Sequence, residues 1–284
     1  MRIAVAGSTG TVGAHVVRQA RAAGHDVVAI SRTPGRPPAG AAAGAAAGAA
    51  AGAAAGAAAG DGPATGATPP GALTTLAADL TTATELRLDG VDAVIDVSAS
   101  GKLSGSEEFF GAVTENLLRA AAAAGVTHYV ALSIVGAAGH PFGYYAGKAL
   151  QERLVSAGPV PWTVLRATQF FEFAEQSAFS LWRFSAIVKM RTQPVAAASV
   201  AGRLLELALG EPQGFAQDLA GPDELWLADL GRMVFETHGL GQTVIELPLP
   251  GKFGRAVRSG ACLPGPAAMI DNVSYEDWLT EGAR

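Results

Sequence analysis

The chain has little cysteine, little histidine and little charge. One cysteine, Cys262, occurs among 284 residues, and only 16% of the residues are charged. A single cysteine cannot form an internal disulfide, which is typical of the reducing cytoplasm, so we expect a cytoplasmic protein with a structural thiol. His128, His140 and His238 lie far apart without spaced acidic or cysteine partners, and we therefore predict no metal site.

The sequence also lacks a block of basic residues. Its 20 Lys and Arg are scattered among 25 Asp and Glu, which gives a formal net charge of −5. This balance excludes the basic surface typical of proteins that bind nucleic acid or a membrane. One arginine precedes an amino-terminal apolar run that a Gly-Ser-Thr-Gly sequence interrupts, so we expect no export signal.

The stretch from Ala39 to Gly60 repeats alanine and glycine and contains no Leu, Ile, Val or Phe. Its glycines, four residues apart, mimic a membrane helix-dimer motif, but the run has too little apolar surface to enter a bilayer. Each glycine also costs a helix about 1 kcal/mol relative to alanine. We predict that residues 34–70 are a low-complexity, disordered insertion.

Apolar runs and helical periodicity alternate along the rest of the chain. This alternation predicts an α/β fold with a Rossmann-type, doubly wound parallel sheet. We predict a dinucleotide-binding core over residues 1–165 and a small substrate-covering region over residues 166–284, packed on the core. The strands are expected at residues 2–6, 26–30, 76–80, 91–97, 127–133 and 162–167, and the helices at 12–23, just after Leu80, at 107–124 and at 144–157.

A glycine-rich turn joins the first strand to the first helix. Gly7, Gly10 and Gly13 follow a buried strand, open a helix and begin a βαβ unit. A pyrophosphate needs close backbone approach, free N–H groups and the positive end of a helix, and this turn provides all three. An ordinary tight turn is the alternative. The predicted dinucleotide-binding residues here are Gly7, Ser8, Thr9, Gly10, Thr11, Val12 and Gly13.

The ends of the next strands predict the rest of the cofactor site. Ser31 and Arg32 stand where an acid would bind the ribose of NAD, and Arg32 can instead pair with the 2′-phosphate of NADP or remain a solvated surface residue. We therefore expect NADP(H) to be preferred over NAD(H). Asp79 and Leu80 are expected near the adenine, although Asp79 can equally cap a helix. Ser98 and Ala99 are small enough for the cofactor to pass close by.

Three residues indicate a catalytic site. Tyr144 and Lys148 lie four apart at the start of a helix and share a face, and Ser133 ends the preceding strand. Reduction of a carbonyl needs an acid for the forming alkoxide, and a nearby ammonium is expected to lower the pKa of a tyrosine. Lys148 can also bind the nicotinamide ribose. In the alternative interpretation Tyr144 and Tyr145 only pack and Lys148 is solvated; Tyr145 is expected to pack in either case.

The segments GSTGTVG, ALSIVG, YYAGKALQE, LRATQFFEF and PLPGKFGRAVRSG resemble atypical short-chain dehydrogenase/reductases of the NmrA-like, NAD(P)H-binding group. The resemblance covers nearly all the chain outside the alanine repeat. It implies a Rossmann fold, NADP(H) binding and a pocket under the carboxy-terminal part, with Arg166, Thr168 and Phe170 on the nicotinamide side. The group includes quinone reductases, carbon-carbon double-bond reductases and non-catalytic redox sensors. Some members of the group lack the tyrosine that corresponds to Tyr144, and these members imply a role for Lys148 alone.

Three functions are compatible with these residues. The first is an NAD(P)H-dependent oxidoreductase that reduces a small apolar carbonyl or quinone, with Tyr144, Lys148 and Ser133 as catalytic residues. The second is a dinucleotide sensor without turnover, and the third is a sugar-nucleotide epimerase, disfavoured because the cap is expected to be short and apolar. Phe170, Phe171 and Phe173 can line an apolar pocket or belong to the core. The sequence defines neither the substrate nor the oligomeric state.

The composition of the alanine repeat leads to a testable prediction. Deleting Ala41 to Gly60 removes little buried apolar surface, so the melting temperature and the dinucleotide affinity should remain close to those of the full chain. Thermal unfolding and a cofactor titration of the shortened protein measure both. A large loss of stability would show that the segment is a packed crossover helix.

Overall fold

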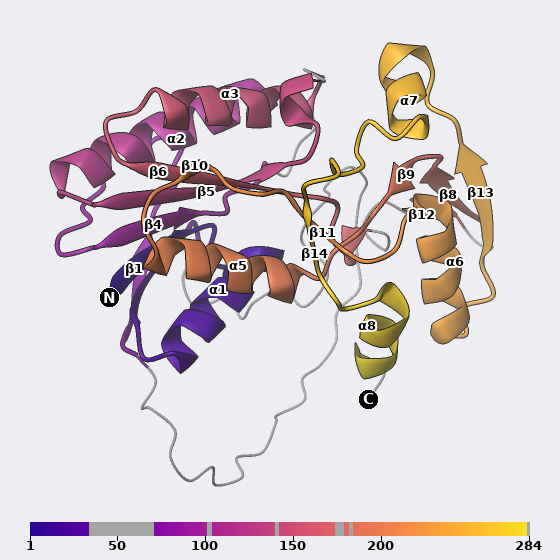
Figure 1. Ribbon diagram of the computed structural model, residues 1–284, viewed down its shortest axis with the longest axis horizontal. Coiled ribbons are helices and arrows are strands. Elements are labelled where there is room, and N and C mark those ends of the chain that lie inside the picture. The colour runs from indigo at the N-terminus through magenta and orange to yellow at the C-terminus, as the bar shows by residue number, and fades with distance from the viewer. Residues whose placement is uncertain (34–70, 101–103, 140–141, 174–178, 182–183, 283–284) are drawn as a thin grey trace, which may run out of the picture.

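The computed structural model describes residues 1–33, 71–100, 104–139, 142–173, 179–181 and 184–282 (Figure 1). The predicted insertion at residues 34–70 lies outside these ranges. The described residues form a parallel sheet between two layers of helices, with the carboxy-terminal elements beside it.

The central sheet has the order β3-β2-β1-β4-β5-β6, and all its strands are parallel. Apolar runs form these strands, apart from the edge strand β3, and helices cover both faces of the sheet. Three short strands, β10 (Gly214–Phe215), β11 (Leu219–Ala220) and β14 (Met269–Ile270), extend the sheet beyond β6. The predicted fold class is confirmed. The six main strands are β1 (Arg2–Ala6), β2 (Asp26–Ser31), β3 (Leu73–Ala77), β4 (Ala93–Asp96), β5 (His128–Ile134) and β6 (Trp162–Ala167).

Two pairs of helices cover the two faces of the sheet (Figure 1). On one face, α1 (Thr11–Ala22) and α5 (Ala197–Leu209) bury an apolar stripe that includes Val16 and Leu204. On the other face, α2 (Ser106–Ala123) and α3 (Tyr144–Ser156) pack on the strands, and a short 3-10 turn, η1 (Ala137–Gly139), precedes α3. Apolar residues three and four apart give each helix one inward face.

Two expectations about the third crossover are wrong. The third strand is Leu73–Ala77 rather than residues 76–80, and it is mostly exposed because it lies at the edge of the sheet. Its register with β2 pairs Val27 with Leu73 and Ser31 with Ala77. The segment expected to be helical after Leu80 forms turns up to Gly90. Asp79 starts the first of these turns by accepting hydrogen bonds from the backbone and hydroxyl of Thr81.

The carboxy-terminal segment contains a small sheet that the sequence analysis did not predict. In it β8 (Phe184–Val188) lies between β7 (Phe179–Leu181) and β13 (Thr243–Leu247). A pair of two-residue strands, β9 (Arg191–Thr192) and β12 (Leu225–Trp226), leads into α6 (Leu227–Thr237), which is followed by α7 (Gly251–Arg258) and α8 (Tyr275–Gly282). These elements bury a third apolar cluster, which includes Phe171, Ile187 and Leu230. We call this region the cap.

The cap and the core are not separated at the predicted boundary. Residue 165 lies inside β6, and α5, β10, β11 and β14 come from the later segment but belong to the layers of the central sheet. Tyr145 of α3 is part of the apolar cluster of the cap. The first turn of α3 therefore touches both parts of the molecule.

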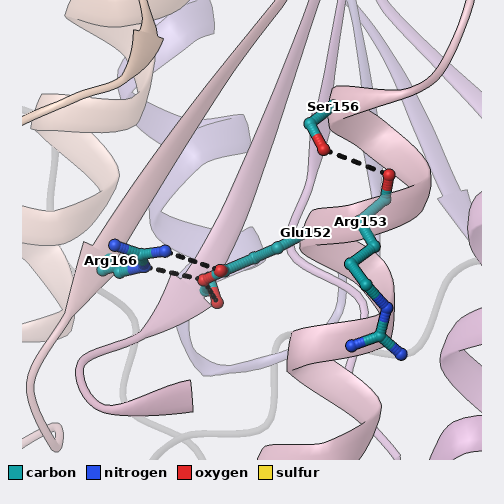
Figure 2. A network of polar contacts seen from close by, with 5 residues as sticks. Glu152, Arg153, Ser156 and Arg166 are labelled. Atoms are coloured by element: carbon teal, nitrogen blue, oxygen red, sulfur yellow. Dashed lines mark hydrogen bonds and ion pairs between the residues drawn. The ribbon is translucent and has the colours of Figure 1, made fainter. Parts of the chain in front are cut away.

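A buried ion pair holds α3 against β6 (Figure 2). Arg166 donates two hydrogen bonds to Glu152, from Nε to Oε1 at 2.8 Å and from Nη2 to Oε2 at 2.7 Å. The Glu152 side chain is 6% exposed and that of Arg166 is 26% exposed. Ser133 adds a hydrogen bond to the same carboxylate, at 2.6 Å. The Arg166 guanidinium also lies 4.4 Å from the centroid of the Phe215 ring.

Breaking this pair from one side should destabilise the fold. We expect Arg166→Met to lower the free energy of unfolding by roughly 2 to 4 kcal/mol, because the Glu152 carboxylate is then buried without its cation. The double variant Glu152→Leu/Arg166→Met should recover most of that loss. Urea unfolding measures both effects, with Arg153→Met as the control because Arg153 is the exposed neighbour of Glu152 on α3. An unchanged midpoint for Arg166→Met would show that solvent already screens the pair.

Candidate functional site

The glycine turn between β1 and α1 is tightly packed against the end of β4. Gly7 has φ +83, and a Cβ atom there would lie 2.8 Å from the carbonyl oxygen of Val97. A Cβ atom on Gly13 would lie 2.1 Å from the carbonyl oxygen of Gly7. Any larger residue at these two positions would push α1 or the end of β4 away from the turn.

The amides that open α1 fit an anionic group. Gly10 is the residue before the helix and makes no side-chain cap, and the first turn contains no acidic residue. A Cβ atom on Gly10 would meet only the Gly7 carbonyl oxygen, at 3.3 Å, so the backbone is open on its outer side. The free N–H groups and the positive end of the helix dipole together favour a phosphate here. The turn thus has the features that a dinucleotide pyrophosphate requires.

Side chains in the turn have different surroundings. Thr9 and Thr11 are partly exposed, whereas the Val12 side chain is part of the core, so only the backbone of Val12 is open to a ligand. The amide and the hydroxyl of Ser8 both donate to the carbonyl oxygen of Ile30, at 3.2 and 3.1 Å. Ser8 therefore ties the turn to β2.

The predicted adenine side lies at the ends of β2 and β3. Arg32 is exposed one residue after β2, and Ser31 is partly buried at its last position. Hydrogen bonds from Thr81 lower the pKa of Asp79, and the positive charge of Arg32 lowers it further. The Leu80 side chain is buried in the core. Asp79 therefore caps a turn, which is close to the alternative expectation that it caps a helix. Leu80 does not offer its side chain to a ligand.

A buried carboxylate, Asp96, ends β4 directly under the glycine turn. It is fully buried and accepts hydrogen bonds from the Tyr129 hydroxyl at 2.9 Å and from the Gln151 amide at 2.8 Å. The backbone N–H of Ser98 adds a third, at 3.0 Å. Ser98 is buried and its hydroxyl has no hydrogen-bond partner in the structure, while Ala99 is exposed. The backbone of Ser98 lies close to Gly7, and the expected approach of a cofactor to Ser98 and Ala99 stays a prediction.

Lys148 is a buried cation that points toward this same segment. It is 4% exposed, and its Nζ donates to the carbonyl oxygen of Leu132 at 2.8 Å, to Oε1 of Gln151 at 2.9 Å and to the carbonyl oxygen of Ser98 at 3.5 Å. Its Nζ also lies 4.3 Å from the centroid of the Phe110 ring. Burial lowers the pKa of Lys148 to about 8, and the charges of Asp96 and Glu152 oppose that shift. Lys148 is therefore still charged at neutral pH.

Tyr144 is partly exposed at the start of α3, one turn before Lys148. Its ring packs edge-on against Phe110 at a centroid distance of 5.3 Å, and the Lys148 Nζ lies 6.0 Å from its centroid. Burial and, secondarily, the charge of Asp96 raise the pKa of Tyr144. This direction is opposite to the lowering expected from the ammonium, because burial and the negative charge of Asp96 both disfavour the ionised form. Tyr144 is therefore protonated at neutral pH.

Ser133 lies on β5 but its hydroxyl donates to Glu152. The structure therefore brings Tyr144 and Lys148 together on one face of α3, and joins Ser133 to the ion pair one helical turn further on. The catalytic roles of all three residues stay predictions. The sequence analysis missed Asp96 and Gln151 as members of the site. An acid inside the apolar run VDAVIDV, and a glutamine three residues after Lys148, were the available signals.

The aromatic residues after β6 belong to the core rather than to an open pocket. Phe171 is fully buried and packs on Tyr275 and Trp278, while Phe170 and Phe173 are partly buried against apolar clusters. Tyr145 packs as expected, and its hydroxyl lies 3.1 Å from Sγ of Cys262. Thr168 donates to the carbonyl oxygen of Gln193 at 2.6 Å.

Two features are absent from the described residues. No three His, Cys, Asp or Glu side chains come together there as a candidate metal site, and His140 lies outside those residues. None of the helices in the same part of the chain has the length and apolarity needed to cross a membrane.

Solved structures share this fold over nearly the whole chain. MoeE5 in complex with UDP-glucuronic acid and NAD has a TM-score of 0.68 and 16% identity, covering 99% of this chain and 97% of that one. TunA, an NAD-dependent NDP-hexosamine 5,6-dehydratase, has a TM-score of 0.66 and 15% identity, with 99% and 96% covered. A nucleoside-diphosphate-sugar epimerase from Staphylococcus aureus has a TM-score of 0.63 and 16% identity, with 98% and 99% covered. At these identities the similarity establishes the fold.

The share of each chain that is covered bears on the expected length of the cap. Because the chain spans almost the full length of these proteins, its cap is not short in comparison with theirs. The expected difference in the length of the cap is therefore not found.

A family model establishes the relationship in sequence. Residues 61–209, more than half of the 284, match the family described as NAD(P)H-binding. The matched segment begins after the glycine turn and includes Asp96, Tyr144 and Lys148. No curated protein matches the chain. The match to the family model shows that the chain belongs to the family described as NAD(P)H-binding.

Proposed function

We propose that this protein is an NADPH-dependent oxidoreductase that reduces a small apolar carbonyl or quinone, and that it falls in the NmrA-like group. One observation carries the proposal. Tyr144 and Lys148 share a face of α3, and the Lys148 ammonium reaches the Ser98 segment that backs the glycine turn. A proton donor and a fixed positive charge thus lie beside the region where a dinucleotide fits.

When bound, the cofactor supplies hydride from C4 of its nicotinamide. The residues of the chain then have separate tasks. The glycine turn binds the pyrophosphate through backbone N–H groups, and Lys148 offers an N–H to the ribose. Tyr144 carries a proton at its hydroxyl at neutral pH, and this proton can pass to a forming alkoxide. Burial raises the pKa of Tyr144, which makes the hydroxyl a weaker acid and does not by itself favour reduction or oxidation.

The preference for NADPH rests on the end of β2. The end of β2 carries Ser31 and the exposed Arg32 rather than an acid, while Asp79 follows the neighbouring strand β3 and is influenced by the charge of Arg32. A guanidinium can bind a 2′-phosphate through two parallel N–H groups, while an acid would repel it.

A second candidate function is sugar-nucleotide epimerisation or dehydration. It is favoured by the similarity in fold across the cap to MoeE5, TunA and the epimerase, whose titles name nucleotide sugars. A tyrosine and a lysine beside the nicotinamide can support transient hydride transfer to and from a sugar as well as net reduction.

One experiment separates these functions. Purified protein is titrated with NADPH and NADH, then incubated with NADPH and quinones, aldehydes or enones, and in parallel with NAD and UDP-glucose or UDP-glucuronic acid. We expect loss of NADPH absorbance with a carbonyl or quinone. A changed sugar nucleotide without net cofactor consumption would support the second candidate instead. Cofactor binding without any turnover would indicate a dinucleotide sensor.

The position of Arg32 gives a prediction about cofactor choice. NADPH should bind more tightly than NADH, and Arg32→Ala should weaken NADPH binding by about 1.5 to 3 kcal/mol, the range for a hydrogen bond to a charged group. NADH affinity should barely change. Fluorescence titration measures both, and Arg153→Ala is the control because it removes the same charge from an exposed position on α3. Equal losses for both cofactors would show that Arg32 does not bind the phosphate.

Tyr144 and Lys148 should have distinguishable roles. Tyr144→Phe keeps the ring against Phe110 and removes only the proton donor, so kcat should fall on the order of 100-fold while the Kd for NADPH stays near that of the wild type. Lys148→Ala removes the ribose contact and a buried charge, and should weaken both binding and turnover. Steady-state kinetics and cofactor titration measure these effects. Full activity in Tyr144→Phe would assign the proton to water or another group.

A further inference from the structure

Gln151 lies between two buried charges of opposite sign. Its side chain is on α3, one turn after Lys148, and is 1% exposed. Oε1 accepts from the Lys148 Nζ at 2.9 Å, and Nε2 donates to Oδ2 of Asp96 at 2.8 Å. One amide therefore contacts the ammonium with its oxygen and the carboxylate with its nitrogen.

This arrangement fixes the orientation of the amide. Turning the side chain over would place N–H groups against the ammonium and an oxygen against the carboxylate, and both contacts would be repulsive. Among the ion pairs of the described residues, none joins Lys148 directly to Asp96. Asp96 thus compensates the charge of Lys148 through Gln151 rather than by contact.

The remaining contacts of Lys148 show the effect of keeping Asp96 out of direct contact with the ammonium. An ammonium has three N–H groups, and the carbonyl oxygen of Leu132 and Oε1 of Gln151 accept two of them at 2.8 and 2.9 Å. The third reaches the Ser98 carbonyl oxygen at 3.5 Å, a long and weak hydrogen bond. A direct contact with Asp96 would compete for that third N–H. With Gln151 in between, the N–H points to the segment beneath the glycine turn and is the one that a ribose hydroxyl can take.

We propose that Gln151 is a positioning residue, which couples Asp96 to Lys148 and aims the third N–H of the ammonium at the ribose of the cofactor. The proposal rests on the proposed function, because it assigns Lys148 to the ribose. Gln151 itself does not touch the reacting atoms. It acts by fixing both the charge and the direction of Lys148.

The charged and titratable groups around Lys148 are few. Asp96 faces it from β4 through Gln151, and Tyr144 and Glu152 lie on its own helix. From α2 it meets the uncharged ring of Phe110, and from β5 a backbone carbonyl, while Tyr129 on that strand is engaged with Asp96. Changing Gln151 therefore alters the principal link between the lysine and its nearest compensating charge.

The first arm of the test measures the titration of Lys148 without cofactor. Lysine residues are labelled with carbon-13 at Cε, and the NMR signal missing from Lys148→Arg identifies Lys148. We expect a midpoint near pH 8 in the wild type, where burial sets the pKa to about 8. Gln151→Leu removes a neutral acceptor and should lower the midpoint by about one to two pH units. Gln151→Glu places a carboxylate directly on the ammonium and should raise it.

The second arm measures NADPH affinity at pH 7.5 by fluorescence titration. Gln151→Leu should raise the Kd about tenfold, because the ammonium loses both charge and direction. The matched control is Gln19→Leu. Gln19 donates from Nε2 to the carbonyl oxygen of Ala198 at 2.9 Å and links α1 to α5 on the opposite face of the sheet. That variant loses a comparable hydrogen bond and should leave the Lys148 midpoint and the Kd unchanged.

The outcomes separate positioning from a structural role. An unchanged Lys148 midpoint in Gln151→Leu, or the same change in Gln19→Leu, would overturn the proposal. A shifted midpoint with an unchanged Kd would also overturn it, because Lys148 would then not be aimed at the cofactor. If Gln151→Leu does not fold, Gln151→Met and Gln151→Glu decide, since their expected midpoints move in opposite directions. If the wild type binds no NADPH the proposed function fails, while the titration still decides the link to Asp96.

Discussion

The site depends on a positive charge held out of water at Lys148. Removing an ammonium from water is strongly unfavourable unless acceptors replace its hydration. Here the replacements come from three places: a backbone carbonyl inside β5, the loop after β4, and a glutamine on α3 itself. Each acceptor is held by the sheet or by the helix that packs on it. The cation therefore requires the ends of β4 and β5 and the start of α3 to keep their relative positions.

The glycine turn places a second constraint on the segment after β4, whose Ser98 carbonyl oxygen Lys148 contacts. Because Gly7 touches the Val97 and Ser98 backbone, the pyrophosphate turn and the lysine contact opposite sides of one short segment after β4. A shift of that segment would change both the turn and the third contact of Lys148. The geometry of the turn and the direction of the ammonium are in this way set by one packing arrangement, although the residues that provide them lie far apart in the sequence.

The sequence predicted the parts of the fold that rest on local patterns. Buried apolar runs identified five of the six main strands, and the glycine spacing located the turn between β1 and α1. The predicted bounds of the third strand were wrong because this strand lies exposed at the edge of the sheet. The apolar residues around Leu76 therefore do not mark where the strand begins and ends. The small sheet of the cap was missed because β8 and β13 lie far apart in the chain and pair only in the fold. For the site, spacing found Tyr144 and Lys148, but the Asp96–Gln151 link depends on a contact between a strand end and a helix that no local pattern specifies.

The face of α3 toward the sheet divides its polar residues between two tasks. Lys148 and Gln151 connect to Asp96 at the end of β4, whereas Glu152 connects to Ser133 on β5 and Arg166 on β6. In this division Ser133, near the end of β5, bonds to Glu152 rather than joining the contacts of Lys148. The Ser133 hydroxyl donates to the Glu152 carboxylate, which forms the ion pair with Arg166 that holds α3. Because a hydroxyl has only one hydrogen to donate, Ser133 cannot donate to another group while this bond is formed. If the chain is a reductase, the proton transfer then depends on Tyr144 and on a lysine whose direction the rest of the helix maintains.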